Sequence, residues 1–182
     1  MSELGIEEMN FDQLFTQISP EEIRDNVFTL GFTAITAGKQ GRYNSMIGSG
    51  GGFGLLFKKP AIWSLLRSDR YTLELIQKEQ TYSLSYFPNE LKEQVLFLGS
   101  ESGRDSEKMK EVKLTSVSTP SGNISFKEAR LIIECRLTAI VTPNPDDFYS
   151  PEARAYINEA YKEARDYRKL VLGEITQVWV KK

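Results

Sequence analysis

Short runs of hydrophobic residues recur along most of the chain, and their spacing predicts more strand than helix. From Thr81 to Phe87, tyrosine and leucine alternate with serine, which is the period-two pattern of a strand. Segments rich in β-branched and aromatic residues, with few breakers, are also expected to be strands. These segments are residues 27–37, 43–47, 61–66, 130–142 and 170–180, and a short pair of strands within 114–126 around a turn at 120–123.

Glycines interrupt this pattern at two places. The glycines at 50–52 predict a segment too flexible for a regular element, followed by a turn of helix over 53–57. Gly173 is expected to interrupt the last strand.

The predicted helices are short and lie between the strands. Thr72 is the expected N-cap of a helix over 73–79, with Tyr71 placed to pack against Ile76. Further helices are expected over 20–26, from Asn89 with Leu91, Val95 and Leu98 on one face, over 105–112, and after Ser150-Pro151, where Ala153, Tyr156, Ile157, Ala160, Tyr161 and Ala164 recur at helical spacing. The residues alone therefore indicate an α+β, mainly β fold. Peripheral helices around dominant strands fit a Greek-key-like barrel better than alternating βαβ units.

Length and composition fit one ordinary globular domain. The 182 residues contain no repeat, low-complexity tract or linker, and 40% of them are hydrophobic and 26% charged. We expect a single domain over 1–182, with 1–18 as a polar N-terminal extension that docks through apolar residues such as Phe11 and Phe15.

Charge and hydropathy favour a cytoplasmic protein. The net charge of −2 gives no general attraction to nucleic acid or to an anionic membrane. The acidic start is unlike a signal peptide, and no apolar run approaches the ~20 residues that span a bilayer. The one cysteine, Cys135, cannot form an intramolecular disulfide, which is consistent with a reducing compartment.

The chain contains no histidine, and this narrows the chemistry open to it. Ser-His-Asp and Cys-His nucleophilic machinery are excluded, as is any histidine-ligated metal site. Cys135 lies between Ile133 and Leu137 on one face of a predicted strand, where an unpaired cysteine is usually an inert core residue. A bound cofactor is therefore the economical source of any reactivity.

The segment from Thr36 to Thr72 has the composition of a ligand site. Its first part contains polar side chains beside glycines, which let a backbone approach a bound group closely. The candidate residues there are Asn44, Ser45, Met46, Ile47 and Ser49. The alternative is an ordinary Ser/Gly surface turn.

The second part places cationic residues at a predicted helix start. Helix N-termini favour anions, and a guanidinium group suits a phosphate. The candidates are Arg67, Arg70, Tyr71 and Thr72. The alternative is a solvated turn in which Asp69 neutralises one arginine. Together the two parts predict a site for a phosphate-bearing ligand.

These residues resemble the flavin-reductase-like, FMN-binding split barrels, and most closely the flavoredoxin-like branch. The resemblance rests on the order and spacing of Thr36-Ala37-Gly38, Asn44 with Met46, the glycine-rich turn, the strand after Pro60, and Arg67 to Thr72. It runs from about Ser19 to the C-terminus and includes the blocks 102–105, 166–167 and 173–175. The resemblance implies a split β-barrel with FMN bound by the two groups of candidate residues.

The resemblance also implies a loop near the flavin at residues 102–108. Ser102, Arg104 and Lys108 are the candidate contacts there. Alternatively, Ser102 caps a helix and the stretch from Arg104 to Lys108 is an exposed i, i+4 face. The tyrosines and phenylalanine of the strand 81–87 are expected to be packing residues, at most one wall of the pocket.

Two departures from the branch concern the second substrate more than FMN. Gly50-Gly51-Gly52 stands where the branch commonly has Trp-Gly-Gly, and Asp166-Tyr167-Arg168 stands where relatives often have Asp-Tyr-His. A ring that could cover the flavin is therefore missing from its usual position.

The function implied by the resemblance is NAD(P)H-dependent flavin reduction by a homodimer with flavin near the subunit interface. Electrons would pass from a transiently bound NADH or NADPH through FMN to free flavin or a protein acceptor. The alternatives are a flavoredoxin-like electron carrier without nicotinamide turnover, and a barrel that has lost flavin and serves as an interaction protein.

Overall fold

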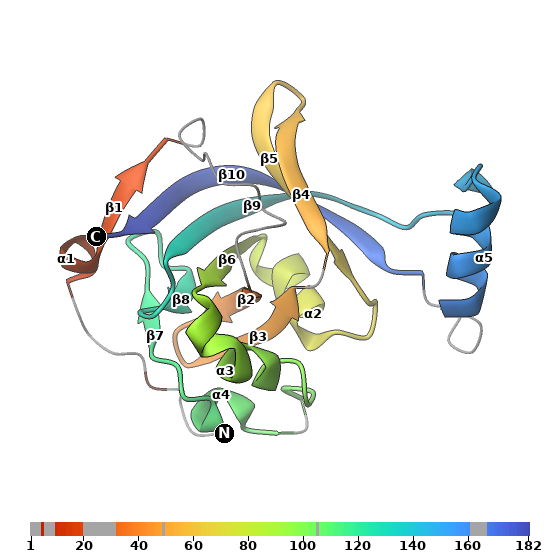
Figure 1. Ribbon diagram of the computed structural model, residues 1–182. Coiled ribbons are helices and arrows are strands. Elements are labelled where there is room, and N and C mark those ends of the chain that lie inside the picture. The colour runs from red at the N-terminus through yellow and green to blue at the C-terminus, as the bar shows by residue number, and fades with distance from the viewer. Residues whose placement is uncertain (1–4, 6–9, 20–31, 49, 105, 161–166) are drawn as a thin grey trace.

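One antiparallel sheet of eight strands dominates the fold (Figure 1). The computed structural model describes residues 5, 10–19, 32–48, 50–104, 106–160 and 167–182. The strands follow the order β3-β2-β6-β9-β10-β5-β4, and β1 pairs with β10. The strands of this sheet are β1 Phe15–Ile18, β2 Phe32–Lys39, β3 Arg42–Gly48, β4 Gly51–Leu56, β5 Lys59–Leu66, β6 Thr81–Phe87, β9 Leu131–Val141 and β10 Lys169–Lys181.

The main path of this sheet is open, because its two end strands do not pair with each other. Among the described residues, β3 pairs only with β2 and β4 only with β5, although β3 and β4 follow one another along the chain. A separate two-stranded sheet of β7 (Ser116–Ser118) and β8 (Ile124–Phe126) packs beside the main sheet. The strands predicted from the sequence are confirmed wherever they fall on described residues. Residues 27–31 of the first predicted strand, and the helix predicted over 20–26, lie outside them.

The irregular segment predicted at 50–52 and the helical turn at 53–57 are wrong. Residues 51–56 form strand β4, paired with β5 from Gly51–Ser64 to Leu56–Lys59. The glycines serve close approach, because a Cβ on Gly51 would lie 2.1 Å from the backbone oxygen of Trp63. Phe57 and Lys58, with φ of 53° and 65°, make the two-residue turn to β5.

The helices are short, as predicted, but their starts differ. They are α1 Phe11–Leu14, α2 Tyr71–Glu79, α3 Lys92–Phe97, α4 Lys108–Glu111 and α5 Pro151–Ala160, with 3-10 turns η3 Asn89–Leu91 and η4 Pro145–Asp147. The N-cap of α2 is Arg70, not Thr72, and Asn89 starts η3 without a side-chain cap. Thr72 is not the N-cap, because it lies inside the helix and its hydroxyl is hydrogen-bonded to strand β3, as described below.

Strand β10 continues through Gly173, so the predicted interruption is wrong. The register against β9 shifts between Leu172 and Gly173, which marks a β-bulge. Gly173 is required by packing, because a Cβ there would lie 2.2 Å from the Tyr82 hydroxyl oxygen.

Hydrophobic side chains fill both faces of the sheet. One cluster includes Ile35, Leu84 and Cys135, and burial raises the pKa of that cysteine thiol well above its usual range. The expectation that Cys135 is a core residue is confirmed. A second cluster forms beneath α3, α4 and the small sheet, where Phe11 of the N-terminal segment packs edge-to-face on Trp179.

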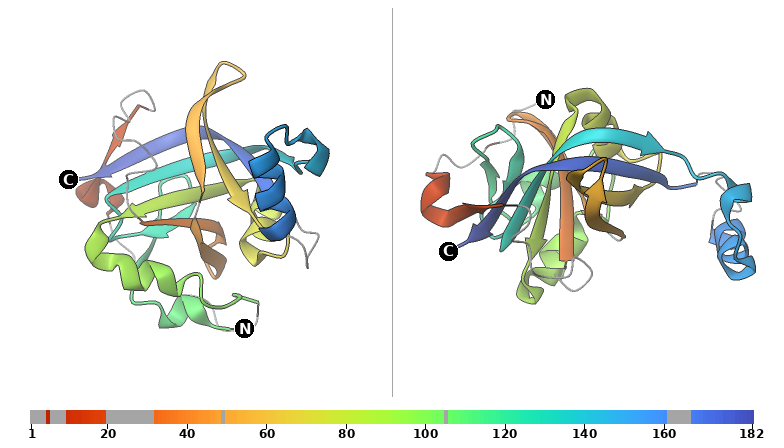
Figure 2. Two further views of the ribbon diagram at one scale, coloured as in Figure 1. Left: turned by 45° about the vertical axis from the view of Figure 1, so that its right-hand side comes forward. Right: turned by 90° about the horizontal axis from the view of Figure 1, so that it is seen from above.

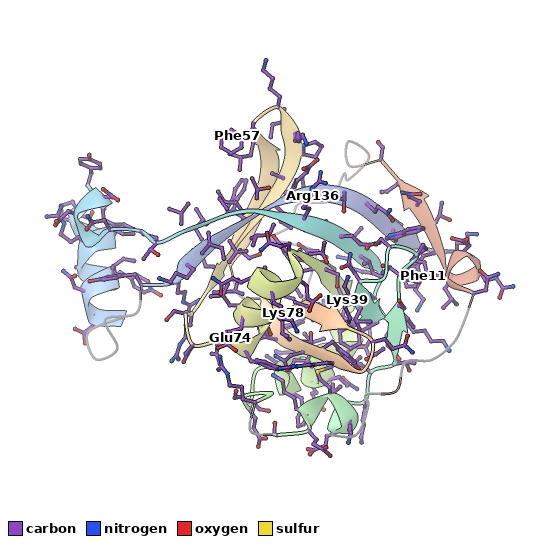
Figure 3. The ribbon with its side chains drawn as sticks, turned by 180° about the vertical axis from the view of Figure 1, so that it is seen from behind. Phe11, Lys39, Phe57, Glu74, Lys78 and Arg136 are labelled. Atoms are coloured by element: carbon purple, nitrogen blue, oxygen red, sulfur yellow. The ribbon has the colours of Figure 1, made fainter. Side chains whose placement is uncertain are left out.

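Two elements project from this body: the β4–β5 hairpin and helix α5 at the far ends of β9 and β10 (Figures 1 and 2). Phe57 marks the hairpin tip in Figure 3 and is 76% exposed. On α5, Tyr156 is 69% exposed and Ala153 and Ile157 are only partly buried, so these three members of the helical stripe do not belong to the buried core. Tyr161 and Ala164 lie outside the described residues. In the described part of the chain, none of the helices is both long enough and apolar enough to cross a membrane.

Candidate functional site

A polar pocket of about 300 Å³ lies beside β3, between the start of α2 and the loop that precedes α4. Ten of the twelve residues predicted from the sequence line it: Asn44, Met46, Ile47, Arg67, Arg70, Tyr71, Thr72, Ser102, Arg104 and Lys108. Ser49 lies outside the described residues. Ser45 is not in the wall, because its hydroxyl is buried and bonded to the Thr36 hydroxyl and to the Ile35 carbonyl.

A buried hydrogen bond joins the two candidate segments. Asn44 Nδ2 donates to Thr72 Oγ1 over 2.8 Å, which ties β3 to the first turn of α2. Asn44 is 3% exposed, and its carbonyl oxygen Oδ1 is buried with no hydrogen-bond partner among the described residues. A buried acceptor without a donor costs about 1–3 kcal/mol, so the corner suits a ligand that donates a hydrogen bond.

Gly103 holds the opposite loop against this corner. A Cβ at Gly103 would lie 2.0 Å from Asn44 Oδ1 and 2.7 Å from its Cγ. Only a residue without a side chain therefore permits the observed approach, and it leaves the Asn44 oxygen next to the loop backbone.

Backbone groups supply further polar contacts. Strand β3 is an end strand of the path, so about half of its N–H and C=O groups point away from β2. The N-terminus of α2 has no side-chain cap, and Arg70, Tyr71 and Thr72 from this end line the pocket. Unbonded N–H groups and the helix dipole at this end favour an anion.

Two of the arginines are engaged by acidic or backbone partners. Arg67 donates to the Asp69 carboxylate over 2.6 Å, as the alternative reading of this turn expected. Arg104 donates to the Asp69 carbonyl over 2.6 Å and to Glu74, and its guanidinium lies over the Tyr71 ring. Their positive charge is therefore partly balanced within the protein.

Lys108 and Arg70 form the cationic part of the pocket. Lys108 is 2% exposed, and its ammonium donates to the carbonyls of Leu98 and Glu101 over 2.7 and 3.0 Å. Burial, together with the nearby positive charge of Arg70, lowers the pKa of Lys108 to about 8. In the described part of the chain, no carboxylate forms an ion pair with Arg70. Arg70 and Lys108 repel each other at this distance, so an anion bound between them would stabilise both charges.

The alternative reading of residues 102–108 is wrong. Lys108 is buried, so it does not belong to an exposed face. Ser102 accepts a hydrogen bond from the N–H of Arg104 in a local turn, whereas the N-cap of α4 is Glu107. Helix α4 covers Lys108–Glu111 and is therefore shorter than the predicted helix over 105–112.

Arg168 and Gly99, which were not predicted as site residues, also lie in the pocket wall, as does Gly103 of the predicted loop 102–108. Arg168 belongs to the C-terminal block in which the chain departs from the flavoredoxin-like pattern. That departure was the available signal.

We expect the Gly103→Ala substitution to displace Asn44 and to lower the free energy of unfolding by roughly 1–3 kcal/mol, because the new methyl group overlaps the buried amide. Chemical denaturation measures this change. Gly54→Ala is the matched control, since a Cβ there meets only the Trp63 ring at 3.8 Å. Equal stability of the two variants would contradict the close packing of Gly103 on Asn44.

Comparisons with known proteins agree with this fold. The family model described as "Flavin reductase like domain" matches residues 28–182. None of the curated proteins compared with the chain matches it.

Solved structures with low sequence identity share the fold, and they include three bacterial proteins. An FMN-binding domain of a flavin reductases-like enzyme from Shewanella baltica aligns with a TM-score of 0.67 and 15% identity, over 91% of this chain and 76% of that one. A putative flavin reductase with a split barrel domain from Shewanella frigidimarina aligns with a TM-score of 0.64 and 20% identity, over 82% of this chain and 66% of that one. Flavoredoxin of Desulfovibrio vulgaris aligns with a TM-score of 0.63 and 18% identity, over 87% of this chain and 74% of that one.

The predicted fold class, a split barrel with peripheral helices, is confirmed by these likenesses and by the open antiparallel sheet. The family match spans β2 to the C-terminus and includes every described residue of the polar pocket. The chain belongs to the family of flavin reductase-like domains.

Proposed function

We propose that the protein binds FMN in the polar pocket and acts as an NAD(P)H-dependent reductase that passes electrons through the flavin to free flavin or to a protein acceptor. The observation that carries this proposal is the buried Asn44–Thr72 corner, whose amide oxygen has no partner among the described residues, in a pocket that two close cations also line. Family membership supports flavin chemistry in general, and the nucleotide and the acceptor belong to the proposal.

The phosphate end of FMN fits the cationic part of the pocket. A phosphate ester carries about two negative charges and three acceptor oxygens near neutral pH. Arg70 and the third proton of the Lys108 ammonium offer donors, and the Thr72 hydroxyl can donate while it accepts from Asn44. The uncapped start of α2 adds backbone N–H groups to the same place.

The hydroxyl-bearing chain of FMN fits the buried corner. A sugar-alcohol hydroxyl can donate to Asn44 Oδ1, for which the described part of the chain supplies no partner. The unpaired backbone edge of β3, at Met46 and Ile47, offers donors and acceptors to the polar edge of the flavin. Ser45 is left out of these contacts, because the sheet already uses its hydroxyl.

When bound, FMN supplies hydride and electron transfer, so the protein needs no catalytic acid or base of its own. Its residues would hold the phosphate and the sugar-alcohol chain and would thereby orient the ring.

A homodimer with flavin near the subunit interface is part of the proposal. Large apolar side chains are exposed on both projecting elements: Leu55 and Phe57 on the hairpin, and Tyr149 and Tyr156 around α5. Such side chains on protruding elements are more typical of an interface than of free surface.

We expect Arg70→Ala or Thr72→Ala to weaken FMN binding by roughly 1–3 kcal/mol, because each removes a hydrogen bond to a charged group. Titration of the purified protein with FMN, followed by flavin fluorescence, measures the effect. Arg67→Ala is the matched control, since Asp69 already engages its guanidinium, and its effect should be much smaller. Unchanged affinity in both test variants would contradict the phosphate assignment.

FMN affinity should depend on pH through Lys108. Protonated Lys108 attracts the phosphate, and its pKa of about 8 in the free protein means that the proton is lost as pH rises past 8. A bound dianion raises that pKa, so affinity should be highest below pH 8 and fall by up to a factor of ten per pH unit above it. In Lys108→Met this decline should disappear. The same decline in both proteins would show that another group is responsible.

The visible spectrum of the purified protein with FMN, before and after anaerobic addition of NADH and NADPH, tests the reductase proposal. We expect the oxidised flavin band to bleach with at least one nucleotide and steady-state nucleotide oxidation in air. Flavin binding without turnover would instead favour the electron carrier. Failure to bind FMN at all would reject the proposed function.

A further inference from the structure

A second pocket, of about 310 Å³, lies in the gap between the two halves of the sheet. We call it the split pocket. It is bounded by β2, β3 and β6 on one side and by β4 and β5 on the other, and its floor includes Ile35, Ile62 and Leu84. Unlike the cationic pocket, it has no charged residue among its described lining residues. Ile47 lines both, so the two pockets meet at β3.

Trp63 forms the β5 wall of the split pocket and lies against a strip of glycine. It pairs with Gly52 across the hairpin, and a Cβ on Gly52 would lie 2.7 and 2.9 Å from two atoms of the indole ring. A Cβ on the neighbouring Gly54 would lie 3.8 Å from the same ring, which is an ordinary van der Waals contact. The absence of a side chain at Gly52 thus fixes an indole beside the pocket, where it is only partly buried.

A purely structural account would have Trp63 cover the glycines of an end strand and stabilise the hairpin. That account explains the contact with Gly52. It does not require the apolar space that remains between the indole and the β2–β3 side of the gap.

We propose that the split pocket holds the planar ring of the flavin, with Trp63 as an aromatic wall. This inference rests on the proposed function, since it continues the ligand from its phosphate in the cationic pocket past Ile47 into the apolar one. A flat fused ring suits a pocket with apolar walls and an aromatic side chain, and stacking or edge contact with an indole is favourable for such rings. The chain thereby has a tryptophan at the flavin from β5, although Gly50 replaces the one expected in the glycine turn.

The chain contains only two tryptophans, and this allows a direct test on the full-length protein. Trp179 is buried and donates to the Glu134 carboxylate over 2.7 Å, so its indole N–H is an internal control. In ¹⁵N-labelled protein, riboflavin (the ring without the phosphate) should shift the indole N–H signal of Trp63 and leave that of Trp179 in place. Inorganic phosphate should move neither signal. The Trp63→Phe variant assigns the two signals.

Affinity gives a second readout. Trp63→Leu should weaken the binding of both FMN and riboflavin by about tenfold, a typical effect of losing one aromatic contact. The concentration of inorganic phosphate that displaces FMN's phosphate end reports on the other pocket, and the affinity for inorganic phosphate should be unchanged in this variant. Trp63→Phe, which keeps a ring over Gly52, should retain most of the affinity. Lys108→Met should weaken the binding of FMN and of inorganic phosphate but not the binding of riboflavin.

Riboflavin binding that leaves the Trp63 signal in place, or that is equally tight in Trp63→Leu, would overturn the inference while FMN binding itself stands. If neither FMN nor riboflavin binds the unaltered protein, the proposed function fails first. Because the signal shift is measured on the unaltered protein, the test holds even if Trp63→Leu does not fold.

Discussion

The hydrogen bond from Asn44 to Thr72 is the interaction on which the rest of the site depends. It joins the free end strand β3 to the first turn of α2, two elements 28 positions apart in the sequence. Because the bond uses the amide nitrogen, the amide oxygen is left buried, and none of the residues that the structure describes pairs with it. Gly103 then closes the loop 99–104 over the same amide. A ligand donor at this oxygen would remove a desolvation penalty that the free protein carries.

The distribution of charge around this corner follows a simple division. The arginines nearer the surface, Arg67 and Arg104, are held by Asp69 and Glu74, which leaves little net attraction for an anion. The cations farther inside, Arg70 and Lys108, lie close enough for one to lower the pKa of the other. In the proposed function the inner pair therefore supplies the attraction for the phosphate, while the outer pair lines the pocket.

Much of the fold could be predicted from the sequence because strand alternation is a local property. The alternation of tyrosine and leucine with serine from Thr81 to Phe87 and the apolar run of β9 are such local signals, and both segments are strands, although β6 and the first half of β9 are buried on both faces. The glycine strip was misread because its strand depends on a distant partner: Trp63 supplies the pairing and the packing that three glycines lack by themselves. In the same way, Gly173 was read as a breaker, although it makes room for Tyr82 within a continuous strand.

The candidate site could be predicted as a set of residues, but their roles could not. The order of residues predicted that Asn44 and Thr72 share a ligand, yet no local pattern shows that they bond to each other. Nor does a sequence distinguish Arg70 from Arg67, since only the fold gives one of them Asp69 as a partner. The burial of Lys108 was hidden as well, because the carbonyls that hold it come from Leu98 and Glu101 in a loop without regular structure.

A crystal structure of the protein with FMN tests the central claim most directly. The account predicts the phosphate within hydrogen-bond distance of Thr72 and Lys108, a flavin hydroxyl bonded to Asn44 Oδ1, and the Asn44–Thr72 bond intact. A phosphate bound elsewhere, or a flavin that leaves the Asn44 oxygen unpaired, would contradict it.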